Sequence, residues 1–152
     1  MVEEGFCIMQ IIRDDEYAAV VYCPDTKCVQ VRWNNGEGPG QREVFDQILQ
    51  LIQERPTFTY IADIREQGVV SDVSRGWMET ELLPVAIMSG LKKVAVVVEE
   101  EIFKQFFRQP AHPPLTQSPQ YLEFRYMYSL EEAQTWATEV YNYYDGRVSH
   151  VA

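Results

Sequence analysis

The stretch SDVSRGW, residues 71–77, sets an aspartate between two serines directly before a tryptophan. Ser71, Asp72 and Ser74 each carry a side-chain oxygen that can accept a hydrogen bond from a backbone N–H at the start of a helix, so capping is one interpretation of this stretch. A switch is the alternative, because a phosphate or a fixed carboxylate at a helix N-terminus meets the positive end of the helix dipole and alters a surface patch.

A second polar cluster lies in ADIREQG, where Asp63, Arg65 and Glu66 follow an apolar stretch. Open α/β sheets bind their ligands at the edge where the strands end. No serine, cysteine or histidine lies nearby in the sequence to complete a pair of nucleophile and base. The cluster therefore predicts a binding surface, with catalysis and an ordinary solvated loop as alternatives, and we assign no catalytic residue.

The segment GEGPG, Gly36 to Gly40, lies where a phosphate-binding turn would precede a helix. It lacks a lysine followed by serine or threonine, and Glu37 would repel a phosphate. We interpret it as a flexible connection and expect no cofactor.

The three cysteines, Cys7, Cys23 and Cys28, have no spacing typical of a disulfide framework, which favours a reducing compartment. Cys23 and Cys28 flank PDTK, so a hairpin would place them face to face. They are interpreted as two reduced, buried cysteines, with a redox pair as the alternative. The only histidines, His112 and His150, lie in a proline-rich stretch and near the C-terminus, so no metal site is expected.

The elements that must position these residues follow from the apolar periodicity. Apolar runs and period-two alternation predict strands, and helical spacing predicts helices. The expected strands are 6–12, 17–23, 28–33, 57–64, 91–100 and 122–128, and the expected helices are 42–56, 72–88, 100–109 and 130–146. An acidic turn at 14–16 should separate the first two strands, the apolar content of 57–64 suggests a central place in the sheet, and 91–100 has the composition of a strand covered on both faces. The apolar stripe of the first helix is Val44, Phe45, Ile48, Leu49 and Ile52, and that of the last is Leu130, Ala133, Trp136, Ala137, Val140 and Tyr144. Pro84 should kink the second helix and Gly90 should end it. Ser129 and Glu132 predict a capping box at the start of the last helix.

The order β-β-β-α-β-α-β-α-β-α predicts an α/β fold with a mixed, mostly parallel sheet and crossover helices. A chain of 152 residues has the size of one domain, so a single domain is expected over 1–152. Four prolines in PAHPPLTQSPQ predict an irregular loop at 110–120.

The formal net charge of −10 argues against a nucleic acid or an anionic membrane as partner and leaves a basic or neutral protein surface open. The longest apolar run, Leu82 to Met88, is too short to span a bilayer, and the N-terminus lacks a basic signal region. These features predict a soluble, cytoplasmic protein.

With the strand TYIADI, the loop REQGVV, the helix opening SDVSRGW and the strand SGLKKVAVVV, residues 17–109 resemble a STAS domain, the fold of bacterial anti-sigma-factor antagonists. They are similar also to bacterial STAS-like proteins described as Sec14-like. In the antagonist family a phosphoacceptor serine follows the strand-end aspartate by nine residues. Counting from Asp63 places Asp72 there instead, which implies a fixed charge, or phosphorylation of Ser71 or Ser74 in a shifted register.

The resemblance implies a non-catalytic domain that binds a protein partner through its second helix and the preceding loop. The residues expected at this surface are Asp63, Arg65, Ser71, Asp72, Ser74, Arg75 and Trp77.

The sequence also allows three other interpretations of its function. One is a small apolar or lipid-like ligand held between the sheet and the second helix by Trp77, Met78 and Met88. Another is a small hydrolase or transferase built on the Asp63 and Glu66 cluster. Tyr141 and Tyr143 of the last helix also suggest self-association as a homodimer.

Overall fold

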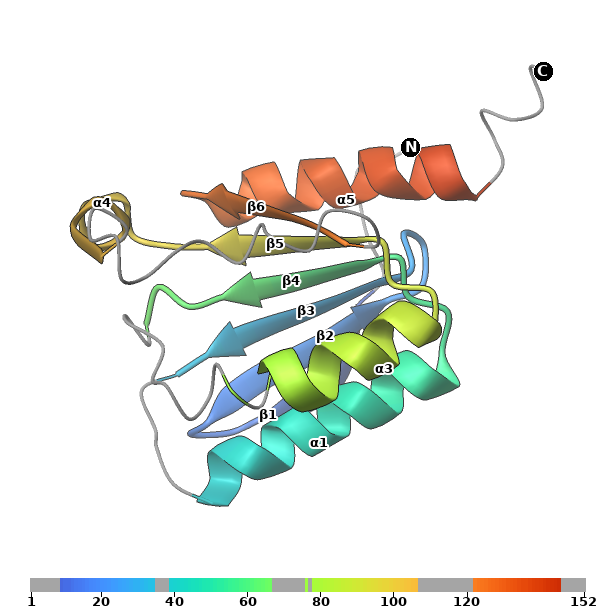
Figure 1. Cartoon of the computed structure of the whole chain (residues 1–152), viewed down its shortest axis with the longest axis horizontal. Helices are drawn as coiled ribbons and strands as arrows, with labels where there is room; N and C mark the ends of the chain where they lie inside the picture. Colours follow the sequence, from blue (N-terminus) through green and yellow to red (C-terminus); the bar gives the residue numbers. More distant parts are fainter. Residues whose placement is uncertain (1–8, 35–38, 67–75, 77, 107–121, 146–152) are drawn as a thin grey trace.

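The computed structural model of the protein describes residues 9–34, 39–66, 76, 78–106 and 122–145. Its centre is one six-stranded sheet in the order β1-β2-β3-β4-β5-β6 (Figure 1). The strands are Gln10–Asp14 (β1), Ala18–Cys23 (β2), Cys28–Trp33 (β3), Thr59–Asp63 (β4), Lys93–Val97 (β5) and Glu123–Met127 (β6). The first three strands pair antiparallel, and β3 to β6 pair parallel. The predicted α/β class and mixed, mostly parallel sheet are confirmed.

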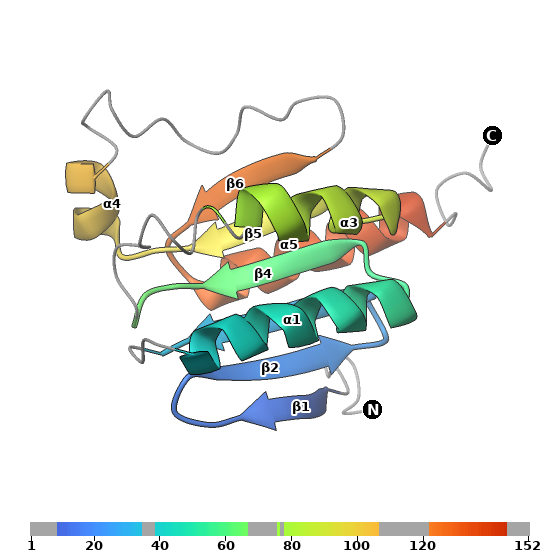
Figure 2. The ribbon, with the colours of Figure 1, turned by 60° about the horizontal axis from the view of Figure 1, so that its bottom comes forward.

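The helices divide between the two faces of the sheet. They are Pro39–Glu54 (α1), Leu83–Met88 (α3), Glu100–Phe106 (α4) and Leu130–Tyr144 (α5), and a π-helical turn, Met78–Leu82 (η1), leads into α3. Figure 2 shows α1 and α3 in front of the sheet and α5 behind it. Right-handed crossovers between successive parallel strands place α1 and α3 on the same face. Among the described helices, none is long and apolar enough to cross a membrane.

The sheet separates two apolar layers, and β4 and β5 contribute to both. On the first face, side chains of α1 and α3 pack on Val20, Val31 and Tyr60. On the second face, Ile61 and Val97 pack against one stripe of α5. All five residues of β4 are buried, which confirms the central position predicted from its apolar sequence.

α1 begins at Pro39, three residues before the predicted start, because proline is well suited to the first turn of a helix. Gly40 is buried, and a Cβ atom at this position would overlap the ring of Tyr17. The apolar stripe predicted for this helix is buried, except that Leu49 is only half-buried and Leu51 takes its place in the core. Pro39 and Gly40 of GEGPG therefore belong to the first turn of α1. Residues 36–38 lie outside the described residues.

Gly90 ends the second helix as predicted, whereas at Pro84 the structure has a change from a π-helical turn to α-helix. Proline at 84 cannot donate to the carbonyl four residues earlier, and the backbone before it forms the π-helical turn η1 rather than regular α-helix. Gly90 has a φ of 106°, and its N–H donates to the carbonyl of Ile87 (3.1 Å) while Leu91 N–H reaches Ala86 (2.9 Å). This paired arrangement ends α3 at Met88. The predicted helical residues 72–75 and 77 lie outside the described part.

Ser129 caps α5 as predicted, since its Oγ accepts a hydrogen bond from Glu132 N–H at 3.1 Å. The reciprocal bond differs from the expected capping box, because the Glu132 carboxylate accepts from the N–H of Tyr128 rather than of Ser129. The helix ends at Tyr144, whose ring is exposed although the pattern placed it on the buried stripe.

The first strand extends to Asp14 and not to residue 12, so the acidic turn predicted at 14–16 begins one residue later. Asp15 forms this turn by accepting hydrogen bonds from the N–H groups of Tyr17 (2.9 Å) and Ala18 (3.2 Å). Residues 6–8 of the predicted strand and the proline-rich stretch 110–120 lie outside the described residues.

Candidate functional site

Asp63 ends β4, and its carboxylate is held by the loop that follows. The residue is 2% exposed. Its Oδ1 accepts hydrogen bonds from Arg65 Nε (2.9 Å) and from the Arg65 backbone N–H (3.2 Å), and its Oδ2 accepts from Nη2 (2.8 Å). A two-pronged pairing of this kind fixes the direction of both side chains. Asp63 therefore anchors the start of the loop, and both of its carboxylate oxygens accept hydrogen bonds from Arg65.

Arg65 is partly exposed and meets further carboxylates at this edge of the sheet. The hydrogen bonds that Arg65 donates to the Asp63 carboxylate raise the pKa of Arg65, and the charges of Asp63, Glu99 and Glu66 add to the effect. Glu99 follows β5, which lies next to β4, and Ile64 N–H donates to Val97 O at 2.9 Å, so the two loops leave the sheet side by side. The predicted convergence of polar residues at the strand ends is thus observed for Asp63, Arg65 and Glu66.

The other residues predicted to contact a partner, Ser71, Asp72, Ser74, Arg75 and Trp77, lie outside the described residues. Their neighbour Gly76 is described, and its carbonyl accepts a hydrogen bond from the Thr80 hydroxyl at 2.7 Å. This bond ties the start of the second helix to the π-helical turn.

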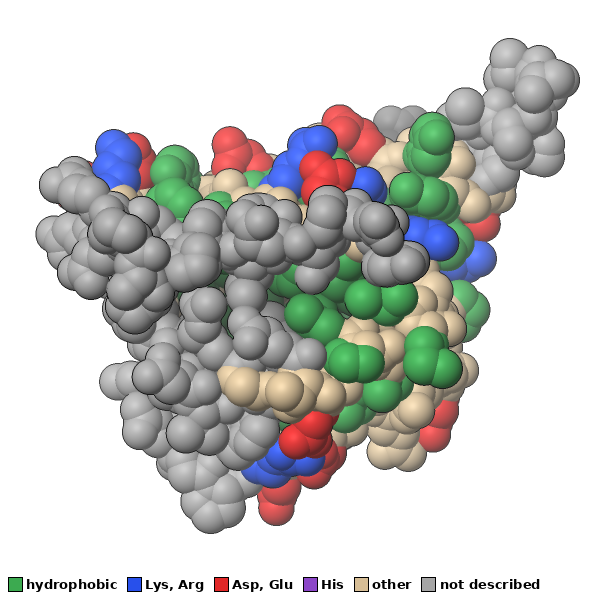
Figure 3. Space-filling view, in the orientation of Figure 1, with side chains coloured by type: hydrophobic (Ala, Val, Ile, Leu, Met, Phe, Trp, Pro, Cys, Tyr) green, Lys and Arg blue, Asp and Glu red, His purple; other side chains and the backbone are tan. Residues whose placement is uncertain are grey.

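The apolar ligand site predicted between the sheet and the second helix receives no support from Met88, which is 87% exposed at the end of α3. Figure 3 shows the apolar surface that surrounds α3 on this face. Trp77 and the side chain of Met78 lie outside the described part. Met88 is the one predicted ligand contact whose side chain lies in the described part, and it faces solvent.

Cys23 and Cys28 occupy directly opposed positions on β2 and β3, as the hairpin prediction requires. They are not bonded to each other: Cys28 is a free, buried thiol, and Cys23 is disulfide-bonded. Cys23 and Cys28 therefore do not form a redox pair, and that alternative is wrong. Cys28 is reduced, as predicted, whereas Cys23 is not. A disulfide at Cys23 does not fit the reducing compartment inferred from the cysteine count.

Burial raises the pKa of Cys28 to about 12, so at neutral pH it is a protonated, unreactive thiol. Within the described ranges no group of three or more histidine, cysteine, aspartate or glutamate side chains could hold a metal ion. Neither an activated thiol nor a metal centre is thus found in this part of the chain.

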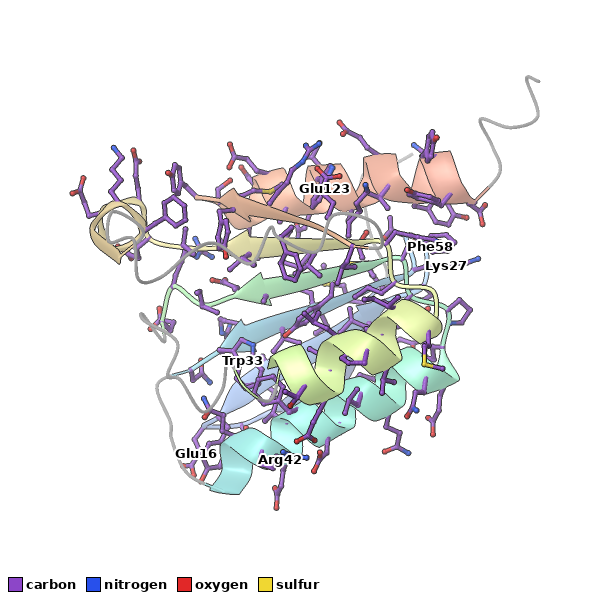
Figure 4. All side chains as sticks on the ribbon, viewed as in Figure 1. Glu16, Lys27, Trp33, Arg42, Phe58 and Glu123 are labelled. Atoms are coloured by element: carbon purple, nitrogen blue, oxygen red, sulfur yellow. The ribbon has the colours of Figure 1, made fainter. Side chains whose placement is uncertain are left out.

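Aromatic and lysine side chains gather where α5 ends. Phe58 and Lys27 lie next to each other at this end of the sheet (Figure 4), with the ammonium 5.3 Å from the ring centroid. The Phe58 ring lies 6.4 Å from that of Tyr141, and Lys92 lies 5.4 Å from the Tyr144 ring. The last turn of α5 carries no basic residue of its own. Lysines from neighbouring loops therefore supply the positive charge that favours a helix C-terminus.

This cluster bears on the homodimer prediction made from Tyr141 and Tyr143. Tyr143 is 63% exposed, whereas Tyr141 is half-buried against Phe58. Only Tyr143 of the pair thus offers most of its ring to another molecule.

A groove on the second face of the sheet was not predicted. It has a volume of about 610 Å³, its floor comes from β2, β3 and β4, and its wall is α5. The alternation of Cys28, Gln30 and Arg32 signalled that this face of β3 is mixed in polarity. The groove itself depends on where α5 lies across the sheet, which no local pattern encodes.

Comparison with known proteins gives no match for this chain among protein-family models, curated proteins or solved structures.

Proposed function

We propose that the chain is a STAS-like, non-catalytic module that binds a protein partner through the loop after β4 and the start of the second helix. The observation that carries the proposal is the pairing of Asp63 with Arg65, which gives this loop a rigid base at the edge of the sheet. A binding loop gains affinity when its geometry is fixed before the partner arrives, because less conformational freedom is lost on association.

The charges at this edge indicate what the partner surface is like. Glu66 and Glu99 are exposed beside Arg65, and Glu100 and Glu101 continue the acidic surface on α4. The whole chain carries a formal net charge of −10. A partner with a basic surface would be attracted at long range and oriented by these carboxylates.

The proposal that the module is non-catalytic rests on the two described groups that were considered as a general base or a nucleophile. The Asp63 carboxylate is paired with Arg65, and the Cys28 thiol is buried with its pKa raised. Neither group is prepared for nucleophilic or general-base work.

The test is affinity capture with the purified protein, identification of the retained partner by mass spectrometry, and calorimetry with that partner after purification. We expect Asp72→Lys and Arg75→Glu to weaken binding by at least tenfold. Glu139→Lys, an exposed charge reversal on α5, is the matched control and should bind as the wild type does. Equal binding by all four proteins, or the absence of a specific partner, would refute the proposal.

Phosphorylation is tested with the same purified protein. The intact mass of the natively purified protein and a Ser71→Ala/Ser74→Ala variant separate a fixed charge at Asp72 from a phosphate switch. Loss of binding with Asp72→Lys and no phosphate mass supports the fixed charge.

A further inference from the structure

The two faces of the sheet are covered unequally by the described helices. Strands lie about 4.8 Å apart and a helix with its side chains is about 10 Å wide, so one helix covers two or three strands. On the first face α1 and α3 lie side by side, whereas on the second face α5 contacts β4, β5 and β6 (Figure 2). Ile11 of β1, which points to the second face, is 72% exposed.

The groove of about 610 Å³ lies between α5 and the strands that the described helices leave uncovered on this face. Met9 and Val21 give the groove its accessible apolar surface, above the buried side chains of Cys28 and Ile61, and Thr135 and Thr138 of α5 line the opposite wall. A volume of this size, with apolar contacts and a few polar groups, is typical of sites for small molecules.

The polar groups in the groove are mainly uncharged. Gln134 Nε2 donates to Gln30 Oε1 at 2.9 Å, which joins the helix wall to the floor. A carboxamide has two donor hydrogens and an acceptor oxygen, so the pair retains both donor and acceptor capacity after this bond forms. Of the described lining residues Glu131 alone has an acidic or basic side chain, and its carboxylate would repel an anion.

We propose that the groove between α5 and the second face of β2 and β3 binds a small amphiphile with an uncharged polar head. The apolar part lies on Met9 and Val21, and the head exchanges hydrogen bonds with Gln30 and Gln134. This site is separate from the partner-binding loop of the proposed function, and neither depends on the other.

The probe for the experiment is N-phenyl-1-naphthylamine, an uncharged aromatic amine whose fluorescence rises in apolar surroundings. We expect it to bind the wild-type protein at a stoichiometry of one. Thr135→Trp and Thr138→Trp place a large side chain on the groove wall and should each weaken binding by at least tenfold. Both positions are exposed on α5, so folding is expected to survive and is checked by circular dichroism.

Asn142→Trp is the matched control, because it adds the same side chain to an exposed position of α5 that does not line the groove. It should bind the probe as the wild type does. Absence of probe binding to the wild type, or equal binding by all folded variants, would overturn the proposal.

Competition tests the head group. Decanamide and decanoate carry the same chain with an uncharged or an anionic head, and decanamide should displace the probe at a concentration at least tenfold lower. Glu131→Gln should reduce that difference. Stronger displacement by decanoate than by decanamide would overturn the assignment of an uncharged ligand.

Discussion

We expect the Cys28 thiol to resist alkylation in the folded protein and to react readily once the chain unfolds. Its pKa is raised from 9.0 to about 12 by burial, and the side chain is 3% exposed. The thiolate is the reactive form, and at pH 8 three pKa units reduce its fraction by about 1000-fold. Folded protein should therefore react with iodoacetamide at least about 1000 times more slowly than the unfolded chain.

The pH dependence has a definite sign. Because the folded state disfavours the thiolate, the unfolded chain loses its proton first as the pH rises above 9. The contribution of Cys28 to stability is thus complete below pH 9 and is lost between pH 9 and about pH 12. In the folded protein the rate of alkylation should rise about tenfold per pH unit through pH 9 without levelling off.

The assay is intact-mass spectrometry of protein incubated with iodoacetamide at several pH values, with and without guanidinium chloride, and peptide mapping to locate the label. Cys28→Ala identifies the part of the mass change that belongs to this residue. Labelling of folded Cys28 within tenfold of the unfolded rate, or a plateau near pH 9, would refute the reasoning.

Two further predictions concern stability. Asp63→Asn removes the anion that accepts three hydrogen bonds from Arg65, and it should lower the free energy of unfolding by about 2 kcal/mol; a urea-denaturation difference below about 0.5 kcal/mol would contradict this. Gly40→Ala should cost about 1–3 kcal/mol, because its Cβ overlaps the Tyr17 ring. In a Tyr17→Ala background the same change should become neutral or stabilising by up to about 1 kcal/mol, and an unchanged cost there would show that the overlap is not the cause.

The parts of the fold that could be predicted from the sequence are those decided by neighbouring residues. The continuous apolar run of β5 predicted a strand buried on both faces, and Gly90 and Ser129 marked where helices end and begin. Proline at 84 predicted a kink, and the structure has a π-helical turn, Met78–Leu82, directly before α3. In each case a few adjacent side chains determine the backbone.

The site was less predictable because it depends on contacts between distant segments. Asp63 was correctly placed at a strand end, but its engagement by Arg65 could not be read from a pattern that suits a solvated loop equally well. The groove requires α5 to lie over β4 to β6, a position held in part by packing of Arg125 on the Trp136 ring at 4.5 Å. Arg125 and Trp136 are eleven positions apart and lie on different elements, so the periodicity of a single strand or helix cannot predict their contact.

The late position of α5 in the chain has a consequence for biosynthesis. All six strands leave the ribosome before this helix, and of the described helices α5 is the one that covers the apolar second face of β4 and β5, with Ile61 and Val97, so this face stays without α5 until residues 130–144 have also left the ribosome. During that interval the nascent sheet exposes a surface that chaperones recognise and that other nascent chains can adhere to. A stalled ribosome that releases the chain before α5 would thus yield an aggregation-prone polypeptide, and slow translation just ahead of α5 would extend the same exposure.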